Sequence, residues 1–322
     1  MIAPRLFTVL VATAWCAASL SWAQPFSSRP LQLVVPNATG AAPDTLARII
    51  AEAAKEEFGN IVVDNRPGGS GTIAAALVKR AAPDGHTLLL AGNTYVVAEA
   101  MNIPRQHDFL KDFEPVIRLS DLPFYLVVRQ DSVPTGSLRE FVEFVKARPG
   151  KLDYITPGNG STHHLAMEMF KLQSRLDIVH VPYKTIAQGV TDMLAGRVHM
   201  TITGYPAVAS HMKTGTLRIL ATVGARRSAL QPDIPTFAEA GVPGVELVSW
   251  WGVVAPAGIP KPVLARLNAA FNRVLEQPQV REKLAGQGLD PVGGSAEAFA
   301  SRIREDYERL VRVIRDTGIK PD

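Results

Sequence analysis

The feature that most constrains the fold of this 322-residue chain is a repeated pattern of a mainly apolar run followed by a polar turn rich in glycine and small residues. Residues 31–36, 87–91 and 152–156 are runs of strand length, and each leads into such a turn. Apolar strands that alternate with helices form mainly parallel sheets covered on both faces. The pattern predicts an α/β fold whose polar turns share the carboxyl edge of a sheet, where open α/β sheets bind ligands.

The turn at residues 158–165 joins a strand to the first turn of a helix. Backbone N–H groups at a helix N-terminus have no partner within the helix and lie at the positive end of its dipole, so they can bind an anion. Glycine lets the backbone approach the anion, and Ser161 or Thr162 can cap the helix or donate a hydroxyl to a ligand. An ordinary capped turn is the alternative interpretation. Residues 37–44 have the same design, with Asp44 expected to face its own helix's N–H groups.

Four turns of this kind supply the candidate ligand-binding residues. They are Asn37, Ala38, Thr39, Gly40, Ala41 and Asp44 in the first turn, Asn93 and Thr94 in the second, Gly158, Asn159, Gly160, Ser161, Thr162 and His164 in the third, and Thr203, Gly204 and Tyr205 in the fourth. None of these residues is a lysine or an arginine, so helix ends and neutral donors are expected to recognise the charge of the ligand.

The N-terminus predicts export. Residues 1–23 combine one early cation, Arg5, with an apolar run and small residues at Ser21 and Ala23, which is typical of a secretory signal peptide cleaved before Gln24. The only cysteine, Cys16, lies inside this segment and fits a lipid-attachment site poorly. The mature protein is therefore expected to be periplasmic and to contain no disulfide, cysteine-ligated metal or cysteine nucleophile.

Length and charge narrow the class further. About 300 mature residues suggest two domains. The formal charge of +4 includes Arg5 and is spread along the chain without Lys/Arg blocks, which argues against a nucleic-acid partner. A return of the chain through the apolar run 248–255 predicts a first lobe of residues 24–122 and 248–322 and a second lobe of residues 123–247, the chain ending in two helices at 262–276 and 296–316.

Two other interpretations, a dinucleotide-binding protein and a hydrolase, compete with that of a ligand-binding protein. Residues 69–74 match the dinucleotide pattern G-x-G-x-x-A, but Arg66 and Pro67 separate them from the preceding strand, so close packing is the preferred explanation for these glycines. A hydrolase could use Ser161 with His164, yet neither Ser70 nor Ser161 lies in G-x-S-x-G, and His163 and His164 lack a third metal ligand at a useful spacing. No catalytic residue, metal or cofactor is expected.

Motifs along the whole mature chain carry a resemblance to one family. They are Arg29-Pro30 with residues 33–36, Asp64-Asn65-Arg66-Pro67-Gly68, Ala81-Ala82-Pro83-Asp84-Gly85, residues 157–165, Val179-His180-Val181-Pro182-Tyr183-Lys184, residues 232–235 with Glu239-Ala240-Gly241, and Ala255-Pro256-Ala257-Gly258. Together they resemble the Bug family, the periplasmic solute receptors of tripartite tricarboxylate transporters.

The resemblance implies a type II periplasmic-binding-protein fold, in which two α/β lobes clasp a small carboxylate in the cleft between them. It also implies the membrane components of such a transporter as partners; a monomer is expected, and a carboxylate sensor for a signalling partner is the alternative role. The chain departs from the family pattern at Ala41, Thr185 and Thr203-Gly204, where glycine, glycine and an acidic residue with asparagine are usual.

These departures lead to an expectation about the ligand. Asp44 is the only acid among the cleft stretches, so an ammonium group there would have no counter-charge. The ligand is expected to be a dicarboxylate or an aromatic acid without an amino group. Tyr95, Tyr205 and Trp251 are candidates to flank an aromatic ring, and packing within their own lobes is the alternative.

Overall fold

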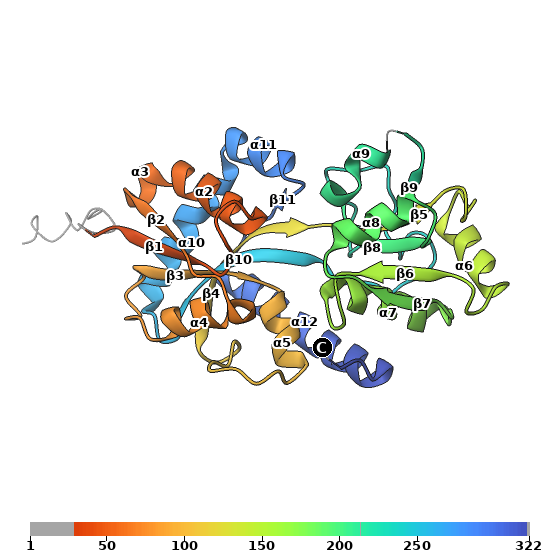
Figure 1. Ribbon diagram of the computed structural model, residues 1–322. Coiled ribbons are helices and arrows are strands. Elements are labelled where there is room, and N and C mark those ends of the chain that lie inside the picture. The colour runs from red at the N-terminus through yellow and green to blue at the C-terminus, as the bar shows by residue number, and fades with distance from the viewer. Residues whose placement is uncertain (1–28, 213, 321–322) are drawn as a thin grey trace, which may run out of the picture.

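The computed structural model describes residues 29–212 and 214–320, so the predicted signal peptide and its cleavage site lie outside the described residues. Two α/β lobes lie side by side and are joined by extended segments that run from one to the other (Figure 1). Among the helices of these described ranges, none combines the length and apolarity that crossing a membrane requires.

The first lobe is built on a six-stranded sheet with the order β11-β4-β10-β3-β1-β2. Its strands are β1 (Leu31–Val35), β2 (Ile61–Asn65), β3 (Thr87–Gly92), β4 (Phe113–Leu122), β10 (Ser249–Pro256) and β11 (Asp290–Pro291). Its helices are α2 (Ala42–Ala53), α3 (Lys55–Phe58), the 3₁₀ turn η2 (Gly69–Gly71), α4 (Thr72–Lys79), α5 (Thr94–Ala100), α10 (Lys261–Glu276), α11 (Pro278–Gly286) and α12 (Ala296–Thr317).

The second lobe is built on a five-stranded sheet with the order β7-β6-β8-β5-β9. Its strands are β5 (Phe124–Arg129), β6 (Asp153–Thr156), β7 (Val179–Pro182), β8 (Met200–Gly204) and β9 (Leu217–Val223). Its helices are α6 (Leu138–Lys146), α7 (Thr162–Ser174), α8 (Ile186–Leu194), the 3₁₀ turn η3 (Tyr205–Ala207) and α9 (Ala209–Met212).

Both sheets are mixed, which corrects the expectation of mainly parallel sheets. β1 pairs in parallel with β2 and β3, whereas β10 runs antiparallel to β3 and β4. In the second lobe β6 is parallel to β7 and β8, whereas β5 is antiparallel to β8 and β9. The antiparallel pairs all involve strands next to the crossings between the lobes. The chain leaves the first sheet along β4 and returns to it along the neighbouring strand β10, so these two strands run in opposite directions.

The strand directions place the predicted turns at the junction of the lobes. β4 ends at Leu122 and β5 begins at Phe124, with only Pro123 between them, so the junction lies at this point. β10 begins there beside the end of β4, and β3 runs opposite to β10, so β1, β2 and β3 all end toward the second lobe. β8 ends at Gly204, which pairs with Phe124, and β6 is parallel to β8, so both end toward the first lobe.

Several elements were not predicted from the sequence. β4, α5 and α11 were missed, and the chain therefore ends in three helices rather than two. β4 carries Glu114, Arg118 and Asp121 within ten residues, which interrupts the apolar run that marks a buried strand. The helix predicted after the turn at residues 158–165 is α7, which begins at Thr162.

Three segments connect the lobes. β4 leads directly into β5, residues 224–248 return the chain to β10, and α12 begins in the first lobe and extends along the second (Figure 1). Leu310 and Val313 of α12 are buried in the same cluster as Met169 and Phe170 of α7. The strands of the first sheet come from residues 31–122 and 249–291 and those of the second from residues 124–223, and the division of the whole chain into lobes stays a prediction.

The close approach of α12 to the first sheet requires a glycine. A Cβ atom on Gly252 of β10 would lie 2.3 Å from Cζ of Phe299, so any larger residue would push the helix away. Beside it, the indole of Trp250 packs edge-on against Phe299 and donates a 2.8 Å hydrogen bond to Asp306. This contact fixes α12 against the strand that carries the chain back from the second lobe.

Candidate functional site

The first turn, between β1 and α2, is held by Asp44 and by Asn65, a side chain from β2 that the sequence pattern does not place at this turn. The Asp44 carboxylate is 2 % exposed and accepts hydrogen bonds from the Gly40 N–H at 2.8 Å and from Asn65 Nδ2 at 3.0 Å. Asn65 Nδ2 also donates to the carbonyl of Asn37, and Asn65 Oδ1 accepts from the Thr39 hydroxyl at 3.2 Å. Asn65, at the end of β2, therefore fixes both ends of the turn.

Asp44 does not face its own helix's N–H groups, which corrects that expectation. Its third partner is Arg48, one helical turn along, whose Nε and Nη2 each lie 3.0 Å from a carboxylate oxygen. The hydrogen bond from Arg48 lowers the pKa of Asp44 against the opposing effect of burial, with further lowering by Gly40 and Asn65. Asp44 is thus an ionised, internally paired group that organises the turn, and the Gly40 N–H is already occupied by it.

The second turn contributes a buried amide. Asn93 is 1 % exposed; its Oδ1 accepts a 3.1 Å hydrogen bond from Ser249 Oγ, and its Nδ2 has no partner among the described residues. Thr94, the first residue of α5, is exposed. A buried donor without a partner costs roughly 1–3 kcal/mol, so a ligand or a water at this position would satisfy it.

The third turn has the conformation that its glycines allow. Gly158 and Gly160 have φ values of +119° and +69°. Ser161 is the N-cap of α7: its Oγ accepts the His164 N–H at 3.2 Å and donates to the Gly158 carbonyl at 2.8 Å. The capping role is therefore the one the structure shows for Ser161. The first-turn N–H groups of Thr162 and His163 have no partner within the helix and follow directly after this cap.

His164 does not lie in a ligand-facing position. It is 6 % exposed, its Nδ1 accepts the Gly160 N–H at 3.1 Å, and its ring stacks on that of His180 with centroids 4.0 Å apart. Because α7 begins at Thr162, residue 164 is in its first turn and points back into the lobe. His163, not His164, is the histidine at the edge of the turn: its ring lies 4.5 Å from Phe124 at the junction, and burial lowers its pKa to about 4.

Of the three aromatic candidates, Tyr205 in the fourth turn and Trp251 are half-buried, whereas Tyr95 is buried. Thr203 and Gly204 are buried at the end of β8, and Tyr205 is half-buried, with its ring in edge contact with Tyr125. Trp251 is half-buried against Gly92. Tyr95 is only 2 % exposed and stacks on Phe109, so it packs within its own lobe and cannot flank a ligand.

The glycines of residues 69–74 serve packing. A Cβ on Gly71 would lie 2.5 Å from the Tyr95 hydroxyl, which instead donates a 2.8 Å hydrogen bond to the Gly71 carbonyl. Gly71 also has a φ of +88°. The dinucleotide-like pattern thus reflects the contact between this turn and α5.

The positions of Ser161 and His164 also do not form the nucleophile and general base that a hydrolase requires. The Ser161 hydroxyl bonds backbone groups on both sides, and His164 Nδ1 accepts from Gly160 rather than from Ser161. A general base must lie within hydrogen-bond reach of its nucleophile. Within the described ranges, no three His, Cys, Asp or Glu side chains are grouped so as to hold a metal ion.

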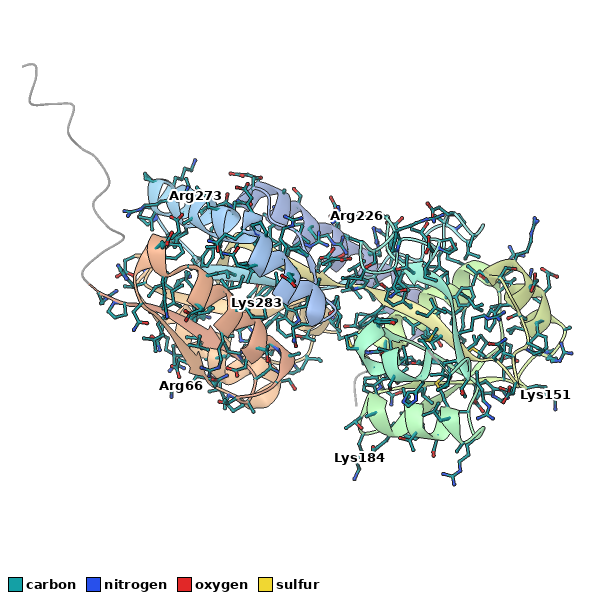
Figure 2. All side chains as sticks on the ribbon, turned by 90° about the horizontal axis from the view of Figure 1, so that it is seen from above. Arg66, Lys151, Lys184, Arg226, Arg273 and Lys283 are labelled. Carbon is teal, nitrogen blue, oxygen red and sulfur yellow. The ribbon has the colours of Figure 1, made fainter. Side chains whose placement is uncertain are left out.

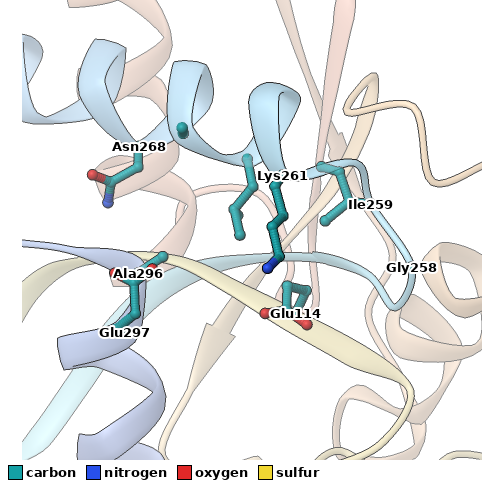
Figure 3. Close-up of a pocket in the computed structure, with 9 residues that line it drawn as sticks. Glu114, Gly258, Ile259, Lys261, Asn268, Ala296 and Glu297 are labelled. Atoms are coloured by element: carbon teal, nitrogen blue, oxygen red, sulfur yellow. The ribbon is translucent and has the colours of Figure 1, made fainter.

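A separate hollow lies at the far end of the first lobe. It has a volume of about 470 Å³ and is lined by Glu114, Lys261, Asn268 and Glu297 among others (Figure 3). These residues belong to the start of β4 and to α10 and α12, and the start of β4 is the end remote from the junction.

Labelled basic side chains such as Arg66, Lys151 and Lys184 are scattered over both lobes (Figure 2).

Two mixed α/β lobes joined by crossing strands, with helix-starting turns facing each other at the junction, define the class of periplasmic solute-binding proteins. Within that class, the chain belongs to the tripartite tricarboxylate transporter receptor family. The model of the "Tripartite tricarboxylate transporter family receptor" matches residues 46–319.

Individual proteins agree with this assignment. Protein BugT of Bordetella pertussis is 34% identical over 315 residues, which cover 97% of this chain and 96% of BugT. The solved structure of R. palustris Rpa4515 with adipate is 36% identical, with a TM-score of 0.73 over 92% of this chain and 99% of that one. MatC from Rhodopseudomonas palustris with bound malate is 30% identical, with a TM-score of 0.69 over 89% of this chain and 99% of that one.

Proposed function

We propose that this protein is an exported solute receptor that binds a small carboxylate between its lobes and delivers it to the membrane components of a tripartite tricarboxylate-type transporter. The observation that carries the proposal is the convergence of helix-starting turns from both sheets on the junction of the lobes. The turns that lead into α2, α5 and α7 offer backbone N–H groups at a positive helix end, which suit a carboxylate. The adipate and malate bound by two family members support this ligand class.

Within the site, the ligand contacts would come from the set of turn residues predicted above. The first-turn N–H groups of α7, the hydroxyl of Thr94 and the unpartnered Nδ2 of Asn93 are the donors best placed to act. Asp44 would act indirectly, since both of its oxygens are bonded inside the protein.

The pairing of Asp44 also supports a ligand without an amino group. Its charge is compensated by Arg48, so it cannot serve as counter-charge for an ammonium group. Adipate, malate and other carboxylates that lack an amine would therefore bind better than their amino-bearing analogues. The proposal also includes three further points: the protein is exported through a signal peptide cleaved before Gln24, it acts as a monomer, and it is not an enzyme.

The test is titration of the mature protein with adipate and with malate by calorimetry, together with two glycine variants. Gly160→Val introduces a branched side chain at a φ of +69° in the third turn, and Gly215→Val does so at a φ of +72° in a loop at the far end of β9. Both variants carry similar backbone strain. Gly160→Val should abolish binding and Gly215→Val should retain it; equal affinities in the two variants would remove the third turn from the site.

A further inference from the structure

Two stacked histidines are linked by hydrogen bonds to the two glycines of the third turn, Gly158 and Gly160. His164 lies in the first turn of α7, and His180 lies on β7, the edge strand beside β6. Their ring centroids are 4.0 Å apart and the rings are inclined by 14°, and the ring of Tyr154 of β6 lies 4.9 Å from that of His180 and 6.2 Å from that of His164. The stack thus joins three elements immediately behind the turn.

Each histidine reaches one glycine. His164 Nδ1 accepts the Gly160 N–H directly at 3.1 Å. His180 Nε2 lies 2.7 Å from the Thr156 hydroxyl, which donates to the Gly158 carbonyl at 3.1 Å and accepts the Gly158 N–H at 3.3 Å. The Gly158 carbonyl also accepts the Ser161 hydroxyl, so the hydrogen bond between His180 Nε2 and the Thr156 hydroxyl can run in either direction, according to the tautomer of His180.

We propose that His164 and His180 are positioning residues that set the conformation of the carboxylate-binding turn at residues 158–162. This inference rests on the proposed function for its consequence in binding, but its structural part stands without any ligand. With Gly160 fixed by His164, the following N–H groups of Thr162 and His163 are held in one orientation. A ligand that relies on backbone donors gains affinity when those donors are ordered before it arrives.

The hydrogen bond to Gly160 requires a neutral His164 ring. His164 Nδ1 accepts a hydrogen bond, so a proton at that atom removes the acceptor and turns two donors toward each other. A charge on both rings would also place like charges about 4 Å apart. The other titratable groups that face the stack are the phenol of Tyr154, which donates at 2.6 Å to Glu168, and the Lys171 ammonium, which is paired with Glu168 and lies 5.4 Å from the Tyr154 ring. Acidification should therefore loosen the turn.

The first experiment needs no ligand. Amide hydrogen exchange is measured by NMR on protein labelled with ¹⁵N-glycine, for the wild type, His164→Phe and His164→Asn. Phenylalanine keeps a planar ring for the stack but offers no acceptor, whereas the asparagine Oδ1 occupies about the place of Nδ1. Exchange at Gly160 should accelerate by about tenfold or more in His164→Phe and stay near wild type in His164→Asn. Unchanged exchange in His164→Phe would overturn the proposal.

The second experiment measures adipate affinity at pH 7.5 and pH 5.5. The Kd of His164→Phe should rise about tenfold at pH 7.5, which corresponds to the loss of one ordered hydrogen bond, and His164→Asn should restore binding. The wild-type Kd should also rise on acidification, and that of His164→Asn should change less. For His180, the glutamine amide can donate to or accept from the Thr156 hydroxyl as Nε2 does, so His180→Gln should bind more tightly than His180→Phe.

The outcomes separate this inference from the proposed function. If Gly160→Val abolishes adipate binding and His164→Phe binds as the wild type does, the turn is the site and the histidines do not position it. If the wild type binds neither adipate nor malate, the proposed ligand class fails, and hydrogen exchange at Gly160 alone decides the role of His164.

Discussion

His163 should make the protein less stable in acid, and the structure gives the size of the effect. Its ring packs beside Phe124 where the lobes meet, and burial lowers its pKa to about 4. In the unfolded chain a histidine has a pKa of about 6.5, so between these two values the unfolded state binds a proton that the folded state does not. The neutral side chain thus contributes stability above pH 6.5 that is lost as the pH falls toward 4.

The gap of about 2.5 pH units corresponds to roughly 3 kcal/mol when fully developed, at 1.36 kcal/mol per unit. At pH 5.0 the loss is about 2 kcal/mol, because 1.5 units of the gap have then been crossed. This is a substantial part of the 5–15 kcal/mol by which a typical domain is stable.

The assay is urea unfolding at pH 7.5 and pH 5.0 for the wild type and His163→Gln. Glutamine is neutral at both values, so the wild type should lose about 2 kcal/mol more than the variant on acidification. All other histidines are present in both proteins and cancel in the comparison. An equal loss in the two proteins, or an NMR titration of the His163 ring near pH 6.5, would refute the reasoning.

Three further predictions concern packing, the first turn and the ligand. Gly71→Ala should destabilise the protein by about 1–3 kcal/mol in thermal unfolding, because the new Cβ meets the Tyr95 hydroxyl at a φ of +88°; stability equal to wild type would show that the turn can move away. Asp44→Ala and Asn65→Ala should be coupled by about 0.5–3 kcal/mol in a double-mutant cycle, since the two side chains share a hydrogen bond within one network, and additive effects would contradict this. Succinate should give a larger thermal shift than aspartate, and a ligand at a hundred times its Kd stabilises by about 2.7 kcal/mol; a larger shift with aspartate would mean that an acidic partner for the amine exists.

Local sequence was sufficient for the class of fold and for the positions of the turns. Apolar strands such as β3 and the glycines at 158 and 160 are visible without tertiary information, because alternation and positive φ are properties of short segments. The family motifs extended this to the two-lobed architecture. β4, by contrast, was missed because its charges find partners only in the folded protein: Arg118 and Asp121 bond each other across three residues of the strand.

The roles of individual site residues were decided by tertiary structure. The sequence pattern predicts that Asp44 and His164 lie at the site, because both are in the first turn of a helix that follows a polar turn. Which way they face depends on partners from other strands: Asn65 at the end of β2 for Asp44, and His180 on β7 for His164. Those strands lie about 20 residues from the turns in sequence, so no local pattern could show the contacts. The chain thus determines by itself where the turns are, and the packing of neighbouring strands determines which of their groups are already bonded and which remain to meet a ligand.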